Sequence, residues 1–313
     1  MSNLPTKILF LGASRFALPI LETLAKSDFK PAAVLTAPDK SSGRGLKPSE
    51  SLIKKEAESL GIPVFQPNSL AEIEKTAKEI NPDLLVLAAY GKILPQNILD
   101  LPKFGCLNVH PSLLPKYRGA SPIQYSILNG DKEAGVTVMK MASKVDAGPI
   151  LAQEKFILDR LDYTAPELAE ILSGIGADLL LKVIPFWING KIKLQEQDDS
   201  KATFAKILKK EDGLIDWNDS AAQIERKIRA FVPWPGTFSR LEGKIIKIIS
   251  AKAIDEDTAN KTGEIYLNDK ENLCIKTRKG SLIIKTLQPQ NGKAMDAQSY
   301  LRGNKQAIGK ILE

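Results

Sequence analysis

The chain has 313 residues, of which 43% are hydrophobic and 26% are charged. This composition is typical of a globular protein of one or two domains and argues against a disordered chain. Two cysteines and one histidine are too few for a disulfide framework or a transition-metal site. The N-terminus lacks a signal-peptide layout, and we expect no apolar run long enough to span a membrane, so the sequence predicts a cytoplasmic protein.

The chain is basic, with a net charge of +7 and an isoelectric point of about 9.1. From Lys209 to the C-terminus there are 19 basic and 14 acidic residues, so most of the positive excess lies in the last third. Such an excess favours an anionic partner without identifying it. Nucleic acid and a merely solvated lysine-rich surface both remain open.

The first half of the chain alternates short apolar runs with helical patterns. Strands are predicted at 7–12, 31–37, 64–66, 83–91, 105–110 and 135–141, and helices at 15–26, about 50–60, about 70–79 and 164–187. Residues 38–49, rich in glycine, proline and basic residues, are predicted as a loop. This alternation predicts an α/β fold with a doubly wound, mostly parallel, Rossmann-like sheet.

The pattern changes after residue 189. Residues 190–208 are polar and weakly patterned, which indicates a linker. A helix at 220–231 follows, with Ser220 and Gln223 at the spacing of a capping box. Thr164 and Glu167 have the same spacing at the start of the long helix at 164–187. Short strands at 244–250, 263–267, 273–277 and 281–287 then predict a smaller OB-like β-barrel. The predicted domains are 1–189 and 209–313, joined by the linker.

The turn after the first strand does not indicate a dinucleotide site. It reads GASRFA from Gly12, without the second and third glycines of the G-x-G-x-x-G pattern. A tight turn between a strand and a helix is the simpler interpretation.

The only histidine, His110, lies two residues after Asn108 at the end of a predicted strand. Alternate residues of a strand share a face, so both side chains project together near the edge where open α/β sheets bind ligands. An amide beside an imidazole suits a developing oxyanion and a proton transfer. Asp146, in KVDAGPI after the next strand, is a candidate carboxylate partner. A structural histidine and a simple turn at Asp146 are the alternatives.

The two stretches NVHPSLLPKYRG (108–119) and VDAGPI (145–150) together resemble the signature of enzymes that use 10-formyltetrahydrofolate. The resemblance implies that Asn108, His110 and Asp146 are catalytic and that the co-substrate is 10-formyltetrahydrofolate, with no metal. It also implies folate contacts from the residues that match the family's turn and pterin wall, namely Ser112, Leu113, Leu114, Pro115, Tyr90 and Gly91. Pro111 departs from the glycine that is frequent in the family, and its restriction of His110 to extended geometry fits a strand end.

The resemblance implies attack of an amine on the formyl carbon. Asn108 and a protonated His110 would stabilise the charged oxygen of the tetrahedral intermediate. Asp146, directly or through water, would orient the imidazole and relay a proton towards the leaving nitrogen, N10.

The three residues do not specify which amine is formylated. Glycinamide ribonucleotide formyltransferases consist essentially of the first domain, and formyltetrahydrofolate deformylases carry a regulatory domain ahead of it, where this chain begins its first strand at Lys7. Formyltransferases acting on nucleotide aminosugars can have a similar second domain and are closer rivals. A folate- or RNA-binding protein without catalysis is a further alternative.

Two other stretches resemble methionyl-tRNA formyltransferases. PDKSSGRGLKPS (38–49) is similar to the basic loop with which that family reaches the tRNA acceptor arm, and TFAKILKKEDGLIDW (203–217) with IRAFVPWPGTF (228–238) is similar to the start of its C-terminal domain. The resemblance implies initiator methionyl-tRNA as partner of a monomer. The implied tRNA contacts are Arg44, Lys47, Lys206, Lys209 and Lys210, with a surface loop and a solvated linker as alternatives. Nearby Trp217, Phe231, Trp234 and Phe238 are predicted to pack in the core instead of stacking on bases.

Overall fold

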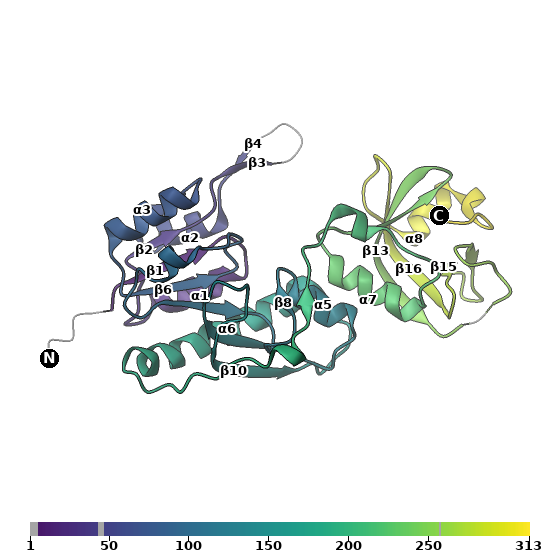
Figure 1. Ribbon diagram of the computed structural model, residues 1–313. Coiled ribbons are helices and arrows are strands. Elements are labelled where there is room, and N and C mark those ends of the chain that lie inside the picture. Colours follow the sequence, from purple (N-terminus) through teal and green to yellow (C-terminus); the bar gives the residue numbers. More distant parts are fainter. Residues whose placement is uncertain (1–5, 43–46, 257) are drawn as a thin grey trace. The chain divides into compact units, whose positions relative to one another are not determined.

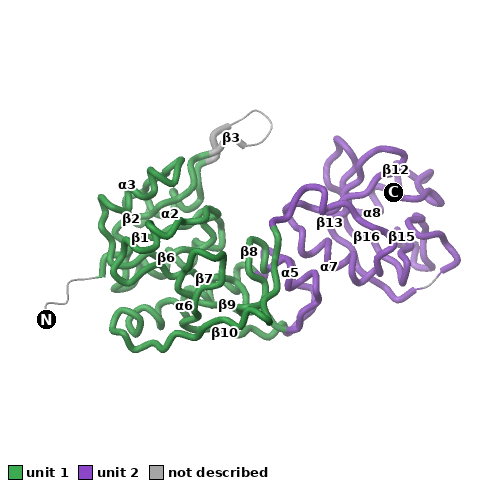
Figure 2. Tube along the Cα trace, in the orientation of Figure 1, with its two compact units in different colours: residues 1–122, 133–158, 169–206 green, residues 123–132, 159–168, 207–313 purple. Residues whose placement is uncertain are grey.

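Figure 1 shows the computed structural model of the chain, which describes residues 6–42, 47–256 and 258–313. Contacts divide the chain into two compact units (Figure 2). Unit 1 consists of residues 1–122, 133–158 and 169–206, and unit 2 consists of residues 123–132, 159–168 and 207–313. Two short segments of the predicted first domain, 123–132 and 159–168, therefore belong to unit 2, and the domain limits given above stay a prediction.

A seven-stranded sheet forms the centre of unit 1, in the order β10-β9-β7-β6-β1-β2-β5. Its strands are β1 (Ile8–Gly12), β2 (Ala33–Leu35), β5 (Val64–Phe65), β6 (Leu84–Ala88), β7 (Cys106–His110), β9 (Glu133–Lys140) and β10 (Ile150–Ile157). β9 runs antiparallel to its two neighbours, β7 and β10, and the other neighbouring pairs of this sheet are parallel. The predicted mostly parallel α/β sheet is thus confirmed.

Helices cover both faces of this sheet. They are α1 (Ala17–Ala25), α2 (Leu52–Ser59), α3 (Leu70–Ile80), α4 (Gln96–Leu99) and α6 (Ala165–Ile188), the last of which begins in unit 2. α3 and α4 share a buried cluster with Leu85 and Cys106. On the other face, Gly176 of α6 lies so close to Val109 and Val136 that a Cβ atom would contact both side chains. The opposite orientation of Cys106 and Val109 on β7 separates the two helix layers.

The prediction of a loop at 38–49 is wrong at its ends. Strands β3 (Lys40–Ser42) and β4 (Lys47–Ser49) form an antiparallel pair there, in which Lys40 is opposite Ser49. The sequence pattern does not reveal this pair of strands, because KSS and KPS have no alternation of apolar and polar residues. Strand β10 was also not predicted, since its exposed middle residues break the apolar pattern.

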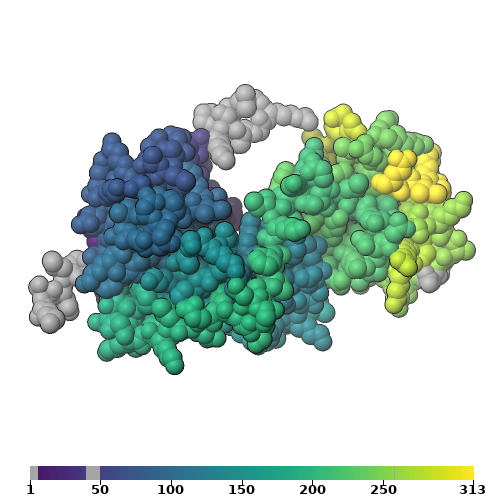
Figure 3. All heavy atoms as spheres, in the orientation of Figure 1, coloured from purple at the N-terminus to yellow at the C-terminus, as the bar shows by residue number. Residues whose placement is uncertain are grey.

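α6 departs from the expectation about membrane spans. Among the described residues, this 24-residue helix is long and apolar enough to cross a membrane. Its most apolar 18-residue stretch has a mean hydropathy of 1.7, and 44% of that stretch is buried. Its contact with β7 and β9 gives a different reason for the apolar composition, because one face packs against the sheet. The carboxyl-terminal part of α6 lies at the surface of unit 1 (Figure 3), where Phe186 is exposed.

Unit 2 is built on an antiparallel half-barrel with the strand order β12-β13-β16-β15-β14, and β17 pairs with β16. Its strands are β12 (Thr237–Leu241), β13 (Lys244–Ile254), β14 (Ile265–Leu267), β15 (Leu273–Lys276), β16 (Ser281–Pro289) and β17 (Met295–Asp296), and its helices include α5 (Pro122–Leu128), α7 (Ala221–Phe231) and α8 (Ala297–Gly303). Ser220 and Gln223 form the predicted capping box of α7. Ile224 and Ile228 of that helix pack into the core of the half-barrel.

Candidate active site

Strand β7 places Asn108 and His110 on one face of the sheet, because two residues of a strand span one full pleat. Both side chains are buried, with 6% and 5% of their surface exposed. Leu87 of β6 and Met139 of β9 lie opposite Asn108, and Thr137 lies opposite His110. This face is the one that α3 and α4 cover further along, as the buried Cys106 of the same strand shows.

Asp146 reaches this face by a route that differs from the expected one. We expected the loop after the next strand to arrive at the carboxyl edge of a parallel neighbour, but β9 is antiparallel to β7. Residues 141–149 therefore leave β9 near Cys106, and the hydrogen bond from Met141 N to Cys106 O fixes this start. The backbone then turns back, with Asp146 at a φ of 48°.

The carboxylate of Asp146 lies between three nitrogen atoms. Asn108 Nδ2 donates to its Oδ1 at 3.3 Å, His110 Nδ1 lies 3.7 Å from its Oδ2, and the backbone nitrogen of Gly119 donates to Oδ2 at 2.8 Å. The other ring nitrogen, His110 Nε2, is 3.0 Å from the carbonyl oxygen of Tyr117. Because a carbonyl oxygen only accepts, Nε2 carries a proton and Nδ1 is the nitrogen that faces Asp146.

The long contacts of Asn108 and His110 leave both side chains able to bind another oxygen. Contacts of this length are frequent between catalytic groups without substrate and shorten when the substrate binds. An oxygen placed beside Asn108 Nδ2 and a protonated His110 Nδ1 would receive two hydrogen bonds in a buried site, where such bonds stabilise negative charge strongly.

Thr137 of β9 holds the predicted folate turn, residues 112–115, by hydrogen bonds to its backbone. The Thr137 hydroxyl donates to the carbonyl oxygen of Ser112 at 2.6 Å, and it accepts from the backbone nitrogen of Leu114 at 3.1 Å. Gln153 of β10 donates to the same hydroxyl at 2.8 Å and to the carbonyl oxygen of Leu114 at 2.9 Å. All hydrogen-bonding capacity of the Thr137 hydroxyl is thus used to fix the turn.

Tyr90 and Gly91, which follow β6, were predicted to contact folate. Tyr90 is 4% exposed and belongs to the apolar cluster beneath α3 and α4, and its hydroxyl has no hydrogen-bond partner among the described residues. Burial raises the pKa of Tyr90 to about 12. Gly91 is exposed at a φ of 80°, and a Cβ atom there would lie within 4 Å of no other side chain or backbone among the described residues. The exposed backbone, more than the Tyr90 ring, is available to a ligand here.

The predicted tRNA contacts are distributed over the chain. Arg44 lies outside the described residues, and the structure describes only the backbone of Lys47. Lys206 is exposed in unit 1, and Lys209 and Lys210 are exposed in unit 2.

The prediction that four aromatic residues pack in the core is wrong for one of them. Trp217 and Phe231 are buried, and Phe238 is half-buried, whereas Trp234 is 58% exposed. Trp234 lies after the end of α7 between two prolines, so it does not share the apolar face of that helix.

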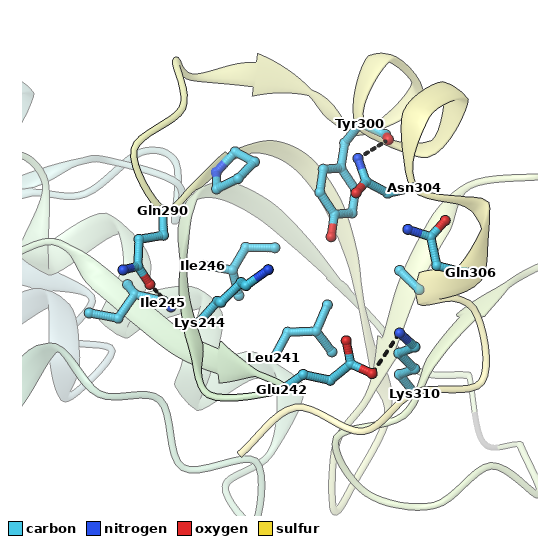
Figure 4. A pocket seen from close by; sticks show the side chains of 12 residues that line it. Leu241, Glu242, Lys244, Ile245, Ile246, Gln290, Tyr300, Asn304, Gln306 and Lys310 are labelled. Atoms are coloured by element: carbon cyan, nitrogen blue, oxygen red, sulfur yellow. Dashed lines mark hydrogen bonds and ion pairs between the residues drawn. The ribbon is translucent and has the colours of Figure 1, made fainter.

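Unit 2 contains a cavity of about 300 Å³ between β12, β13, the end of β16 and α8. Figure 4 shows the Lys244 ammonium and the Tyr300 hydroxyl pointing into it, and Glu242 paired with Lys310 at 2.7 Å at its rim. Burial, followed by the charge of Glu242, raises the pKa of Tyr300. The predicted tRNA-binding lysines do not line this cavity.

Four residues that contact the site were not predicted from the sequence. Thr137 and Gln153 hold the folate turn, and Arg118 and Gln197 hold the loop of Asp146. Arg118 lies within the quoted motif, but only the structure shows that its charge is buried. Gln197 lies in the predicted linker, where nothing in the local pattern marks it.

Comparison with known proteins identifies the family. A formyl transferase model matches residues 6–184, and a formyl transferase C-terminal domain model matches residues 207–305. The methionyl-tRNA formyltransferase of Caldanaerobacter subterraneus subsp. tengcongensis is 39% identical over 98% of this chain and its own full length, and that of Bacillus subtilis is 38% identical over 98% of both chains. The chain belongs to the methionyl-tRNA formyltransferase family.

Solved structures show that the same fold occurs beyond this family. HypX from Aquifex aeolicus, in complex with tetrahydrofolic acid, is 19% identical with a TM-score of 0.66, covering 97% of this chain and 48% of HypX. An N-formyltransferase from Helicobacter canadensis, in complex with folinic acid and dTDP-3-aminofucose, is 23% identical with a TM-score of 0.66, covering 89% and 98%. At these identities the likeness concerns the fold alone.

Proposed function

We propose that the chain transfers the formyl group of 10-formyltetrahydrofolate to the methionine amino group of initiator methionyl-tRNA, which gives formylmethionyl-tRNA for translation initiation. The observation that carries the proposal is the cluster of the buried Asn108 and His110 with the half-buried Asp146, in a chain that is similar over almost its whole length to methionyl-tRNA formyltransferases. Two domains of the formyl transferase kind accompany this cluster.

In the proposed mechanism, the methionine nitrogen attacks the formyl carbon and the carbonyl oxygen becomes negatively charged. Asn108 Nδ2 and the protonated Nδ1 of His110 donate to this oxygen. The C–N10 bond then breaks, and N10 leaves as the amine of tetrahydrofolate. Loss of one such donor typically lowers a rate by about 10²–10³-fold.

One proton must leave the attacking amine and one must reach N10. Asp146 is the proposed relay, because its Oδ2 faces His110 Nδ1 at 3.7 Å, a gap that a hydrogen-bonded water or substrate atom can bridge. His110 stays oriented during this transfer, since Nε2 donates to Tyr117 O. General acid–base assistance of this kind contributes about 10²–10⁴-fold.

The proposed folate contacts are the turn 112–115 and the backbone at Tyr90 and Gly91. The first is supported by the hydrogen bonds that hold the turn rigid, since a pre-formed turn loses little freedom on binding. The second is supported by the exposed, strongly bent backbone at Gly91.

The proposed tRNA contacts are the basic loop with Arg44 and Lys47, together with Lys206, Lys209 and Lys210. Lysines next to phosphates supply affinity without reading sequence. The proposal is supported by the exposure of the last three residues and by the positive excess of the chain after residue 208. We further propose that the protein acts as a monomer, and that it does so in the cytoplasm, where its two substrates are present.

The deciding experiment measures formyl transfer from 10-formyltetrahydrofolate to charged initiator tRNA, with an aminosugar nucleotide and glycinamide ribonucleotide as parallel acceptors. Wild type and His110→Ala are compared, and circular dichroism controls for folding. Transfer to the tRNA alone, lost in the variant, is the expected result. Transfer to a small amine would instead contradict the tRNA assignment, and an unchanged His110→Ala variant would contradict the catalytic cluster.

A further inference from the structure

The segment 195–205, predicted as a linker, packs against both loops of the candidate active site within unit 1. Gln195 forms an antiparallel bridge with Ile150, and β11 (Phe204–Ala205) pairs with β8 (Arg118–Gly119). Between these two anchors, Tyr117 N donates to the hydroxyl of Thr203 at 2.9 Å. The segment is therefore tied to the strand after the Asp146 loop and to the stretch after the folate turn.

The side chain of Gln197 connects these two loops directly. Its Nε2 atom donates to the carbonyl oxygens of Asp146 at 2.8 Å and of Gly148 at 2.7 Å, and its Oε1 accepts from Arg118 Nε at 3.0 Å. Rotation of the amide by 180° would place an oxygen against two carbonyl oxygens, so this orientation follows from the partners. One amide thus fixes the backbone at both Asp146 and the residue two positions later.

Arg118 completes the connection from the other side. It is 1% exposed, and its Nη1 lies 2.7 Å from Asp199 Oδ1, an ion pair without hydrogen-bond alignment. Asp199 also pairs at 2.7 Å with Lys144, which lies in the same loop two residues before Asp146. The Lys144 ammonium and then the Arg118 guanidinium lower the pKa of Asp199, so the pairing charge persists in mildly acidic solution.

We propose that Gln197, itself oriented by Arg118, is a positioning residue that holds the Asp146 carboxylate against Asn108 and His110. The proposal rests on the proposed function, because Asp146 is its proton relay. The backbone of Asp146 is held by Gln197, and its carboxylate by the nitrogen of Gly119, the residue after Arg118. A displacement of about 1 Å in a catalytic group costs about 10²-fold in rate.

Gln197→Glu is the sharpest test. The new carboxylate keeps the contact with Arg118 but repels the carbonyl oxygens of Asp146 and Gly148, so the loop loses its anchor. We expect kcat to fall by about 10²-fold, with KM for both substrates near the wild-type values, because the lost interaction acts in the transition state. Gln197→Met, which keeps the length of the side chain without charge, is expected to lower kcat in the same direction.

A double-mutant cycle separates positioning from general destabilisation. If Gln197 acts through Asp146, then Gln197→Glu in an Asp146→Asn background lowers kcat by less than about threefold. A merely structural role would give the same fold-loss in both backgrounds. Gln298→Glu is the matched control, since Gln298 donates to the carbonyl oxygen of Glu271 on the surface of unit 2. The kcat of the Gln298→Glu variant should equal that of wild type.

Amide hydrogen exchange at residues 144–149 provides a readout that is independent of activity. Gln197→Glu and Gln197→Met should accelerate exchange there, while Gln298→Glu should not. Unchanged exchange and a kcat within threefold of wild type would overturn the proposal. If the wild type itself does not formylate tRNA, the proposed function fails, and faster exchange in the variants would still confirm the anchoring of the loop.

Discussion

The carboxylate of Asp146 makes its shortest described contact with the backbone nitrogen of Gly119, at 2.8 Å, and longer ones with Asn108 and His110. A backbone donor has no protonation state and no rotamers, so it fixes one carboxylate oxygen whatever the charge of the imidazole. The second oxygen is then left to the looser contact with Asn108. The site thus combines one rigid anchor with two adjustable ones.

Gly119→Ala should remove that anchor. Gly119 has a φ of 116°, and a Cβ atom there would collide with the backbone oxygen of Ala205. The strain should lower the free energy of unfolding by about 1–3 kcal/mol and reduce kcat markedly. Chemical denaturation and formyl transfer are the measurements. Gly174→Ala, in α6 with open space around it, should instead raise stability by about 0.5–1 kcal/mol.

Asn108→Ala tests the proposed oxyanion donor. Its amide should be needed in the transition state more than in substrate binding, so kcat should fall by about 10²–10³-fold with little change in KM. Steady-state kinetics with both substrates gives this separation. Asn97→Ala removes an exposed amide that also donates to a carboxylate, that of Glu74 at 2.7 Å, and it should be silent. An equal effect of both changes would count against the assignment.

Thr137→Val should loosen the proposed folate turn. The change leaves Ser112 O and Leu114 N without their buried partner, which costs about 1–3 kcal/mol per unsatisfied group. We expect KM for 10-formyltetrahydrofolate to rise by about tenfold, which corresponds to about 1.4 kcal/mol. Thr137→Ser keeps the hydroxyl and should restore binding. A raised KM for tRNA alone would show that the turn serves another purpose.

Glu167 gives unit 2 a defined dependence on pH. Hydrogen bonds from the hydroxyl and backbone nitrogen of Thr164, and then from Arg160, lower the pKa of Glu167 to about 2. Its stabilisation is therefore present above about pH 4.5 and is lost as the pH falls towards 2. Because the side chain is 45% exposed, Glu167→Gln should cost only about 0.5–1 kcal/mol at neutral pH. Urea titrations of wild type and variant at pH 7 and at pH 2 should show that the difference in their free energies of unfolding is smaller at pH 2.

Lys210→Ala should weaken tRNA binding in a salt-dependent way. If the side chain contacts a phosphate, the slope of log affinity against log salt concentration should decrease by about 1, with KM for 10-formyltetrahydrofolate unchanged. Filter binding over a salt series measures the slope. Lys75→Ala, an exposed lysine beside Glu79 on α3, is the control. An unchanged slope for Lys210→Ala would remove this residue from the interface.

The sequence predicts most of the sheet of unit 1, because strands β1, β2, β6, β7 and β9 are buried on both faces and each is an apolar run between turns. It also predicts the shared face of Asn108 and His110, which depends only on strand periodicity. The direction of β9 was not predictable in this way, because an apolar run is the same in both directions. The approach of Asp146 was therefore expected for the wrong geometric reason, and the roles of all three residues stay predictions.

Long-range polar contacts were beyond the reach of sequence patterns. Gln197 contacts residues about 50 positions earlier, and no local pattern distinguishes it from a solvated glutamine. In unit 2, β12 was not predicted because buried Ser239 breaks its apolar alternation. α8 was not predicted either, although Asp296 caps it through the nitrogen of Ser299, a spacing that the sequence contains.

The discontinuous make-up of unit 2 constrains how the protein can be taken apart. Within this unit, Arg226 of α7 donates to the carbonyl oxygen of Leu128, and Arg229 donates to that of Tyr163. A fragment that starts at residue 209 would keep both arginines and lose both acceptors. Transfer of unit 2 to another enzyme therefore requires residues 123–132 and 159–168 in addition to residues 207–313. A continuous C-terminal fragment does not contain all of this domain.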